Sequence, residues 1–171
     1  MFEEKKRKQE AINAAMSKIK HVIAVASGKG GVGKSTVAAN VALSLAKKGY
    51  RVGLADADIY GPSVPTLFNI ENEQIMVTEV EGKQLMVPFE KYGIKMMSVG
   101  FFVDKDKPML WRGPMAANTL TQMLTETHWG KLDFMVLDMP PGTGDIQLTL
   151  VQQFSVSGSI FVCTPQQLAV A

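Results

Sequence analysis

A glycine-rich stretch near the amino end has the residue types and the spacing of a phosphate-binding loop. Residues 28–35 read Gly-Lys-Gly-Gly-Val-Gly-Lys-Ser and match the pattern G-x-x-x-x-G-K-[ST] at every fixed position. Glycines permit a tight turn whose backbone N–H groups converge on phosphate oxygens. In this pattern the lysine, Lys34, reaches the β- and γ-phosphates, and the hydroxyl of Ser35 can ligate Mg²⁺. We therefore expect ATP and Mg²⁺ to bind here.

Three aspartates follow apolar segments that have the length of buried strands. Asp138 ends the run Phe134–Leu137, which is where a Walker B aspartate holds Mg²⁺ directly or through water. Asp56 and Asp58 follow the run Arg51–Ala55, at the sheet edge where ligands bind in such folds. Either of these two aspartates is placed to orient an attacking water, and either is equally suited to turn or helix-cap chemistry.

Two further positions near these motifs allow more than one interpretation. Lys29 is an additional lysine inside the loop, which suits either a solvent-exposed side chain or a charge delivered to the nucleotide of a neighbouring subunit. Gly142 follows two prolines, so its amide is placed either to sense the γ-phosphate or to form an inert turn. The full set expected to hold the nucleotide is Gly28, Lys29, Gly30, Gly31, Val32, Gly33, Lys34, Ser35, Thr36 and Gly142.

Short apolar runs alternate with helical patterns along the chain, which is typical of βαβ units. The expected class is therefore α/β, with a mostly parallel sheet flanked by helices in a P-loop NTPase fold. The expected strands are Val22–Ala26, Arg51–Ala55, Ile94–Val99, Phe134–Leu137 and Ser159–Cys163, and helices are expected up to about Lys48, over Gly113–Thr127 and up to about Phe154.

The chain divides into a charged start and one domain. Residues 1–20 carry six basic and three acidic side chains and predict a helix docked on the domain, or otherwise an arm for a membrane surface or nucleic acid. Residues 21–171 form the NTPase domain, with a hairpin-like insertion around 75–92. No element follows the last strand to cover it, so we expect a domain that is incomplete at its C-terminal end.

Composition indicates an ordinary globular protein of the cytoplasm. The hydrophobic fraction is 46% and the charged fraction 20%, and no apolar run reaches the roughly 20 residues that span a bilayer. The net charge of +2 is too small to indicate nucleic-acid binding, so neither a nucleic acid nor a membrane is expected as a partner. The single cysteine, Cys163, lies in an apolar run and is expected to be a buried core thiol. His21 and His128 are expected to be structural.

These motifs together resemble the deviant Walker A NTPases, whose loop reads G-K-G-G-x-G-K-[ST] and contains the extra lysine. The resemblance is closer to one branch, the Mrp/ApbC-type iron–sulfur cluster carriers, and runs from about His21 to the last residue. It rests on four segments, which are Asp56-Ala-Asp-Ile-Tyr-Gly-Pro-Ser63, Trp111-Arg-Gly-Pro-Met115, Leu137-Asp-Met-Pro-Pro-Gly-Thr-Gly-Asp145 and Thr164-Pro-Gln166.

The resemblance implies a slowly hydrolysing ATPase that acts as a homodimer and passes an iron–sulfur cluster to apo iron–sulfur proteins. It implies catalytic roles for Lys29, Lys34 and Asp58, with Lys29 reaching across the dimer and Asp58 activating water. It implies that Ser35, Asp58 and Asp138 surround Mg²⁺. It assigns no role to Arg112.

The chain departs from the family pattern in its cysteines. The family holds its bridging cluster with a C-x-x-C pair downstream of residue 171, so we expect a cluster only in the full-length protein. Two other functions remain open for this domain. One is a positioning or partitioning ATPase that engages membrane or DNA through its basic start, and the other is a nucleotide-dependent transcriptional regulator.

Overall fold

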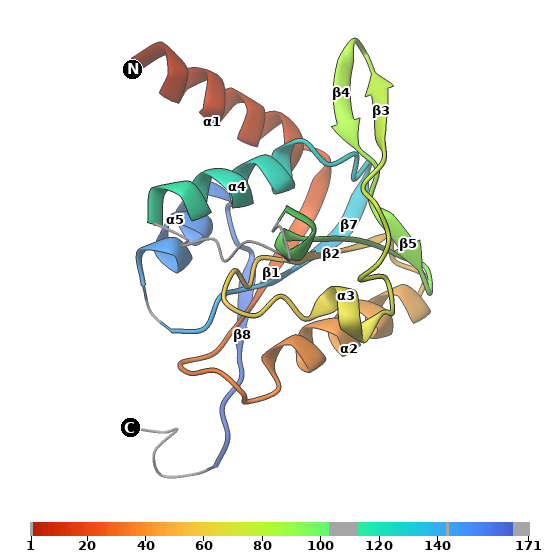
Figure 1. Cartoon of the computed structure of the whole chain (residues 1–171), viewed down its shortest axis with the longest axis vertical. Helices are drawn as coiled ribbons and strands as arrows, with labels where there is room; N and C mark the ends of the chain where they lie inside the picture. The colour runs from red at the N-terminus through yellow and green to blue at the C-terminus, as the bar shows by residue number, and fades with distance from the viewer. Residues whose placement is uncertain (1, 103–112, 143, 166–171) are drawn as a thin grey trace.

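The protein has a central six-stranded sheet with helices on both faces (Figure 1). The computed structural model describes residues 2–102, 113–142 and 144–165. The sheet order is β5-β6-β2-β7-β1-β8, and all its strands are parallel except β5, which runs antiparallel to β6. The strands of this sheet are β1 (Ile19–Ala26), β2 (Val52–Asp56), β5 (Phe89–Lys91), β6 (Ile94–Ser98), β7 (Leu132–Asp138) and β8 (Gly158–Phe161).

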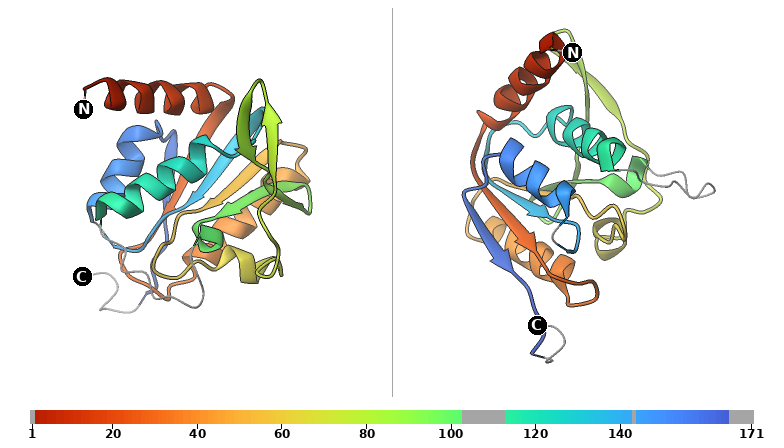
Figure 2. Two further views of the ribbon diagram at one scale, coloured as in Figure 1. Left: turned by 45° about the horizontal axis from the view of Figure 1, so that its top comes forward. Right: turned by 90° about the vertical axis from the view of Figure 1, so that its left-hand side faces the viewer.

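The helices lie in two layers, one on each face of the sheet (Figure 2). Their bounds are α1 (Phe2–Met16), α2 (Lys34–Lys47), α3 (Val64–Leu67), α4 (Gly113–Thr125) and α5 (Asp145–Gln153), with a 3₁₀ turn η1 (Val99–Phe102). One buried cluster joins side chains of α1, α4 and α5 to the sheet, and the second joins those of α2 and α3. This arrangement confirms the expected α/β class with a mostly parallel, helix-flanked sheet.

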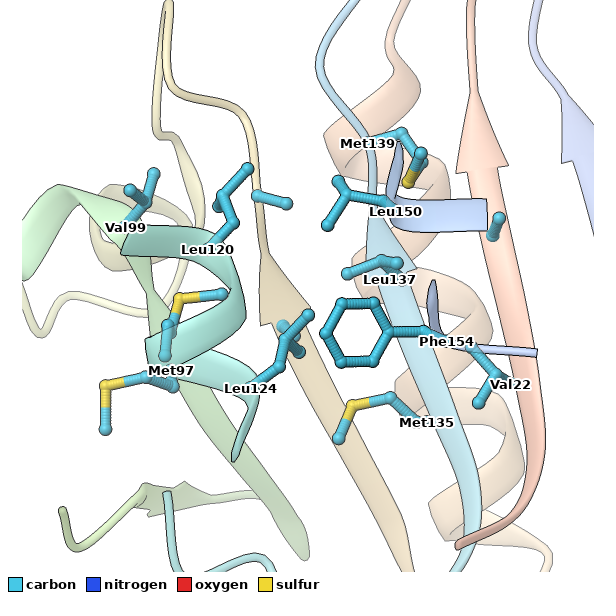
Figure 3. Packing of buried hydrophobic residues seen from close by; sticks show 14 of the residues in the cluster. Val22, Met97, Val99, Leu120, Leu124, Met135, Leu137, Met139, Leu150 and Phe154 are labelled. Carbon is cyan, nitrogen blue, oxygen red and sulfur yellow. The ribbon is translucent and has the colours of Figure 1, made fainter. Parts of the chain in front are cut away.

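Strand side chains alternate between the two cores because successive residues of a strand point to opposite faces. On β7, Met135 and Leu137 belong to the first cluster, and Val136 between them belongs to the second. Figure 3 shows Phe154, from just after α5, close to Met135 and Leu137. The strands are therefore apolar on both faces, as parallel strands covered by helices must be.

The strand register brings several chemically active residues to one edge of the sheet. Asp56 at the end of β2 pairs with Asp138 at the end of β7 on one side and with Ser98 of β6 on the other. Val25 of β1 pairs with Asp138 as well, so the loop that follows β1 leaves the sheet at the same edge. Parallel pairing thus gathers the ends of four strands in one place.

The basic start of the chain is a helix packed against the domain. Ile12 of α1 is only 1% exposed and belongs to the same buried cluster as the α4 side chains. The ammonium of Lys8 also donates a hydrogen bond to Asn118 Oδ1 of α4 at 2.7 Å.

No helix among the described residues is long and apolar enough to cross a membrane.

A separate antiparallel hairpin, β3 (Val77–Val80) and β4 (Lys83–Met86), extends away from the main sheet (Figure 1). Its turn residues Glu81 and Gly82 both have positive φ, 52° and 75°, which is the geometry of a type I′ turn. Backbone hydrogen bonds tie its base to the domain, because Met86 N–H donates to Glu126 O and His128 N–H donates to Met86 O.

The structure corrects the expectation for Cys163, which is exposed and not a core thiol. The last strand is shorter than predicted and ends at Phe161, so Cys163 lies beyond it. Within the described residues β8 is an edge strand that pairs with β1 alone, and Phe161 is 63% exposed. Among the residues that the structure describes, this edge strand has no second neighbour to bury its apolar side chains. The sequence also did not predict that β5, within the expected insertion at 75–92, is a strand of the main sheet and separate from the hairpin.

The packing of α1 generates a stability prediction. Ile12→Ala should lower the free energy of unfolding by about 2 kcal/mol, because it removes a buried side chain that joins α1 to the core. Urea unfolding followed by circular dichroism measures this change. Glu10→Ala, on an exposed position of the same helix, is the control and should change stability little. An Ile12 variant as stable as the parent would show that α1 does not pack on the domain.

Candidate functional site

The loop between β1 and α2 has the backbone shape that its glycines predict. Gly31 and Gly33 have φ angles of 76° and 88°, in the left-handed region that other residues rarely adopt. Helix α2 begins immediately afterwards at Lys34. The first N–H groups of a helix have no intrahelical acceptor and carry the positive end of its dipole. The loop therefore directs several backbone donors toward one region, which suits an anion.

A cavity of about 380 Å³ lies beside this loop. Seven predicted site residues line it, namely Gly30, Gly31, Gly33, Lys34, Ser35, Thr36 and Asp58. Ser27, Tyr60, Gly61, Ser63, Leu67 and Pro141 complete the lining. The other predicted residues, Gly28, Lys29, Val32, Asp138 and Gly142, are not part of its described lining. The volume is within the range of small-molecule sites.

Lys34 is the centre of a buried cluster of charges at the cavity. Its side chain is 6% exposed, and its ammonium contacts Asp138 Oδ1 directly. Asp58 Oδ2 lies 3.3 Å from the same nitrogen, and Ser35 Oγ accepts a hydrogen bond from it at 3.3 Å. Three segments distant in sequence thus meet at one cation, namely the start of α2, the loop after β2 and the end of β7.

Asp138 has a carboxylate oxygen that is available for a further interaction. Among the described residues Asp138 Oδ2 is buried and makes no hydrogen bond. Burial raises the pKa of Asp138, and the neighbouring ammonium of Lys34 acts against that rise. An unpartnered carboxylate oxygen beside the hydroxyl of Ser35 and the carboxylate of Asp58 is the hard oxygen chemistry that Mg²⁺ prefers.

The chain by itself supplies only part of a metal coordination shell. Across residues 2–102, 113–142 and 144–165, no group of three or more His, Cys, Asp and Glu side chains is placed to hold a metal. Magnesium commonly binds through one or two carboxylates together with substrate phosphates and water. The residues present therefore fit Mg²⁺ that arrives together with a nucleotide.

Asp56 and Asp58 have different positions, although the sequence treats them alike. Asp56 is fully buried, and its carboxylate accepts hydrogen bonds from the backbone N–H groups of Asp58, Ser63 and Val64, each at 3.1 Å. The hydroxyl of Ser98 donates to it at 2.9 Å. Asp56 therefore holds both ends of the loop that follows β2.

Asp58 connects that loop to the cavity. Its Oδ1 accepts the N–H groups of Tyr60 and Gly61 at 3.2 and 3.1 Å, and its Oδ2 faces Lys34. One carboxylate oxygen thus orders the loop and the other contributes to the charged cluster. This geometry favours Asp58 over Asp56 as the aspartate that meets a ligand in the cavity.

The loop after β7 contains the other predicted backbone contact. Gly142 has a φ of 94° and its N–H donates to the carbonyl of Ser27 at 2.9 Å. Gln147 of α5 donates to the carbonyls of Pro140 and Pro141 at 3.1 and 2.8 Å, which orders this loop. The amide of Gly142 is therefore used between loops in this structure. Arg112, for which the sequence suggested no role, lies outside the described residues.

Sequence reasoning did not select Ser63 or Ser98. Ser98 ends β6 at the register position opposite Asp56, so it lies at the same sheet edge as the aspartates. A polar residue that ends an apolar strand beside the strand of Asp56 is a signal of the kind that identified Asp138. Ser63 gave no such signal, because a serine before a short helix is ordinarily a cap.

Comparison with known proteins supports a nucleotide-binding assignment. A family model named ParA, with the description NUBPL iron-transfer P-loop NTPase, matches residues 18–171. An iron–sulfur cluster carrier protein of Aquifex aeolicus is 55% identical over 154 residues, 90% of this chain and 42% of that protein. A mitochondrial iron–sulfur protein required for NADH dehydrogenase, from Arabidopsis thaliana, is 50% identical over 90% of this chain and 48% of its own length. The chain thus spans about half the length of the curated relatives it matches.

Solved structures agree with the fold. A nucleotide-binding protein of Archaeoglobus fulgidus, solved in complex with ADP and with cobalt, is 40% identical with a TM-score of 0.79. The similarity covers 94% of this chain and 60% of that protein. The MinC:MinD cell division complex of Aquifex aeolicus has a TM-score of 0.56 at 20% identity, over 88% of this chain and 59% of that one, and shows the fold alone.

The environment of Asp56 generates a prediction about pH. Burial, and then the charge of Asp138, raise the pKa of Asp56 to about 7 from its ordinary value of 3.8. Between these pH values the folded protein keeps a proton that the unfolded chain has released, so the free energy of unfolding falls as pH rises. Asp56→Asn should make this fall in the free energy of unfolding shallower, by up to about 1.4 kcal/mol per pH unit.

Urea unfolding in EDTA without nucleotide, between about pH 4.5 and about pH 6.5, measures both slopes. Asparagine does not titrate, so any constant loss of stability that the substitution causes leaves the comparison of slopes intact. Parallel slopes for the parent and the variant would contradict the raised pKa.

Proposed function

We propose that this chain, which belongs to the NUBPL iron-transfer P-loop NTPases, binds and slowly hydrolyses Mg²⁺–ATP in the service of iron–sulfur cluster transfer. The observation that carries the ATPase proposal is the cluster in which Lys34 and Asp58, both on the wall of the cavity, meet the buried Asp138. A buried lysine between two carboxylates, at the start of a helix that follows a glycine loop, is suited to exchange carboxylate contacts for phosphate contacts.

Each predicted site residue has a role in this proposal. The loop amides of residues 28–36 surround the phosphates, and Lys34 contributes its charge to the β- and γ-phosphate oxygens. Ser35, Asp58 and Asp138 hold Mg²⁺, which supplies positive charge to the same oxygens when it is bound. Asp58 orients the attacking water through the oxygen that faces Lys34 in this structure. The amide of Gly142 is proposed to sense the γ-phosphate, which requires it to exchange its present hydrogen bond to the carbonyl of Ser27 for one to the phosphate.

Lys29 is proposed to act on the nucleotide of a second subunit in a homodimer. It lies in the loop but outside the described lining of the cavity of its own chain, and its side chain is partly exposed. A partly exposed lysine in a phosphate-binding loop that does not line its own cavity is free to meet a second subunit. The proposed dimer thereby couples hydrolysis to the relative position of its two chains.

The carrier function is proposed from the relatives, several of which are named iron–sulfur cluster carrier proteins. We propose that the cluster passes to apo iron–sulfur proteins in the cytoplasm, without nucleic acid or membrane as partner. Clusters are generally held by about four thiolates, and two copies of this chain supply only two. The cluster ligands are therefore proposed to come from a C-x-x-C pair outside this chain.

Two substitutions separate binding from hydrolysis. Lys34→Ala should weaken the affinity for ATP more than tenfold, about 1.4 kcal/mol, because it removes the buried cation that meets the phosphates. Asp58→Asn should keep ATP binding within a few-fold of the parent and lose hydrolysis, because the loop amides and Lys34 remain. Titration calorimetry and single-turnover phosphate release measure the two effects.

Asp133→Asn is the matched control, because Asp133 pairs with Lys20 and Arg51 at the opposite end of β7 from Asp138. It should bind and hydrolyse ATP as the parent does. Normal hydrolysis by the Asp58 variant would refute its role with water. Unchanged ATP affinity of the Lys34 variant would refute the site itself.

Cluster binding should depend on cysteines beyond those of this chain. After anaerobic reconstitution with iron and sulfide, the 171-residue chain should hold no stoichiometric cluster, whereas the full-length protein should hold one. Visible absorption and iron analysis measure the cluster. Stoichiometric iron on this chain that disappears in Cys163→Ser would overturn the expectation, since Cys163 is exposed and accessible to a second copy.

A further inference from the structure

Ser63 has a hydroxyl group that the fold does not use. Ser63 lines the cavity beside the phosphate-binding loop, together with Lys34, Ser35 and Asp58. In the part of the chain that the structure describes, its Oγ is buried and makes no hydrogen bond. Buried hydroxyl groups in proteins nearly always have a hydrogen-bond partner. An unpartnered one in a residue that lines a ligand cavity is available to a ligand once its side chain turns toward that cavity.

Helix capping does not explain this serine. Ser63 occupies the N-cap position of α3, where a serine side chain ordinarily accepts a hydrogen bond from the helix backbone. Here the side chain makes no such bond. The carboxylate of Asp56 takes that function, because its Oδ2 accepts the N–H groups of both Ser63 and Val64. The hydroxyl of Ser63 therefore takes no part in capping the helix.

The backbone of Ser63 is nevertheless held firmly beside the cavity. Asp56 binds the N–H groups of Asp58 and Ser63, and so fixes both ends of the loop between them. Pro62 packs closely against Gly100, where an added Cβ would lie 3.0 Å from the proline ring. Asp58 and Ser63 are therefore parts of one ordered loop, and Asp58 already faces Lys34. Rotation about the Cα–Cβ bond of Ser63 moves its hydroxyl without moving this loop.

We propose that the hydroxyl of Ser63 donates a hydrogen bond to a γ-phosphate oxygen of bound ATP, and that this bond distinguishes ATP from ADP. The inference rests on the proposed ATP binding at the same cavity. A hydroxyl bound to a charged oxygen makes a stronger bond than one bound to a neutral group. ADP lacks the γ-phosphate and leaves the hydroxyl unpaired. Because Asp58 belongs to the same ordered loop, the bond also holds Asp58 beside the triphosphate, where Asp58 meets the attacking water.

The test compares two nucleotides on three variants of the full-length protein. Titration calorimetry with Mg²⁺ gives the affinities for ADP and for the non-hydrolysable analogue AMP-PNP. Ser63→Ala should bind AMP-PNP about tenfold more weakly than the parent and bind ADP within twofold of it. Ser63→Thr keeps the hydroxyl and should restore most of the AMP-PNP affinity. Thr66→Val, which removes an exposed hydroxyl from the same short helix outside the cavity, should match the parent for both nucleotides.

Repeating the titrations in EDTA separates a phosphate contact from a contact to metal-bound water, since only the former retains a Ser63→Ala effect. Three results would overturn the inference: a Ser63→Ala effect that disappears in EDTA, an equal loss of affinity for both nucleotides, or no loss of affinity for either. Each of these results would leave the proposal of ATP binding at this cavity standing. A parent protein that binds neither nucleotide would instead overturn the proposed function. Unchanged ADP affinity also shows that Ser63→Ala is folded.

Discussion

The candidate site depends on one buried cation, the ammonium of Lys34. A buried ammonium must have compensating charges and hydrogen bonds, because leaving it alone away from water is very costly. Asp138, Asp58 and Ser35 provide them from the end of β7, the loop after β2 and the start of α2. The three segments are thus held at one point. Buried ion pairs contribute weakly to stability, since desolvation offsets their attraction, so a gain in stability does not by itself account for this cluster.

The parallel sheet makes this meeting possible. Its register sets Asp56 beside Asp138 and Ser98, so three polar residues end adjacent strands at the same edge. Burial raises the pKa of Asp56, and repulsion between the two carboxylates at neighbouring strand ends adds to that rise. Three backbone N–H groups and the hydroxyl of Ser98 stabilise its charged form in opposition. The same hydrogen bonds order the loop that carries Asp58 and Ser63 to the cavity.

The fold and the positions of most candidate site residues were predictable from the sequence, and the reasons are local. The loop motif specifies its own backbone, as the positive φ angles of Gly31 and Gly33 show, and an aspartate that ends an apolar strand lies at a defined sheet edge. Other features depend on tertiary neighbours. Whether Cys163 is buried depends on what covers β8, and an apolar run carries no sign of being an edge. Asp56 orders the loop after β2, whereas Asp58 faces the cavity. This difference follows from loop hydrogen bonds between residues up to eight positions apart, and the spacing of the two aspartates in the sequence does not predict it.

A crystal structure of the protein with Mg²⁺ and AMP-PNP tests the central claim most directly, which is that Lys34 exchanges its carboxylate contacts for phosphate contacts. The expected result places phosphate oxygens within hydrogen-bond distance, about 3 Å, of Lys34 Nζ and of the amides of residues 30–35. It also places Asp138 and Ser35 in the coordination shell of Mg²⁺ and Asp58 beside the terminal phosphate. A nucleotide bound elsewhere, with Lys34 still paired to Asp138 and Asp58, would contradict the assignment of this cavity as the ATP site.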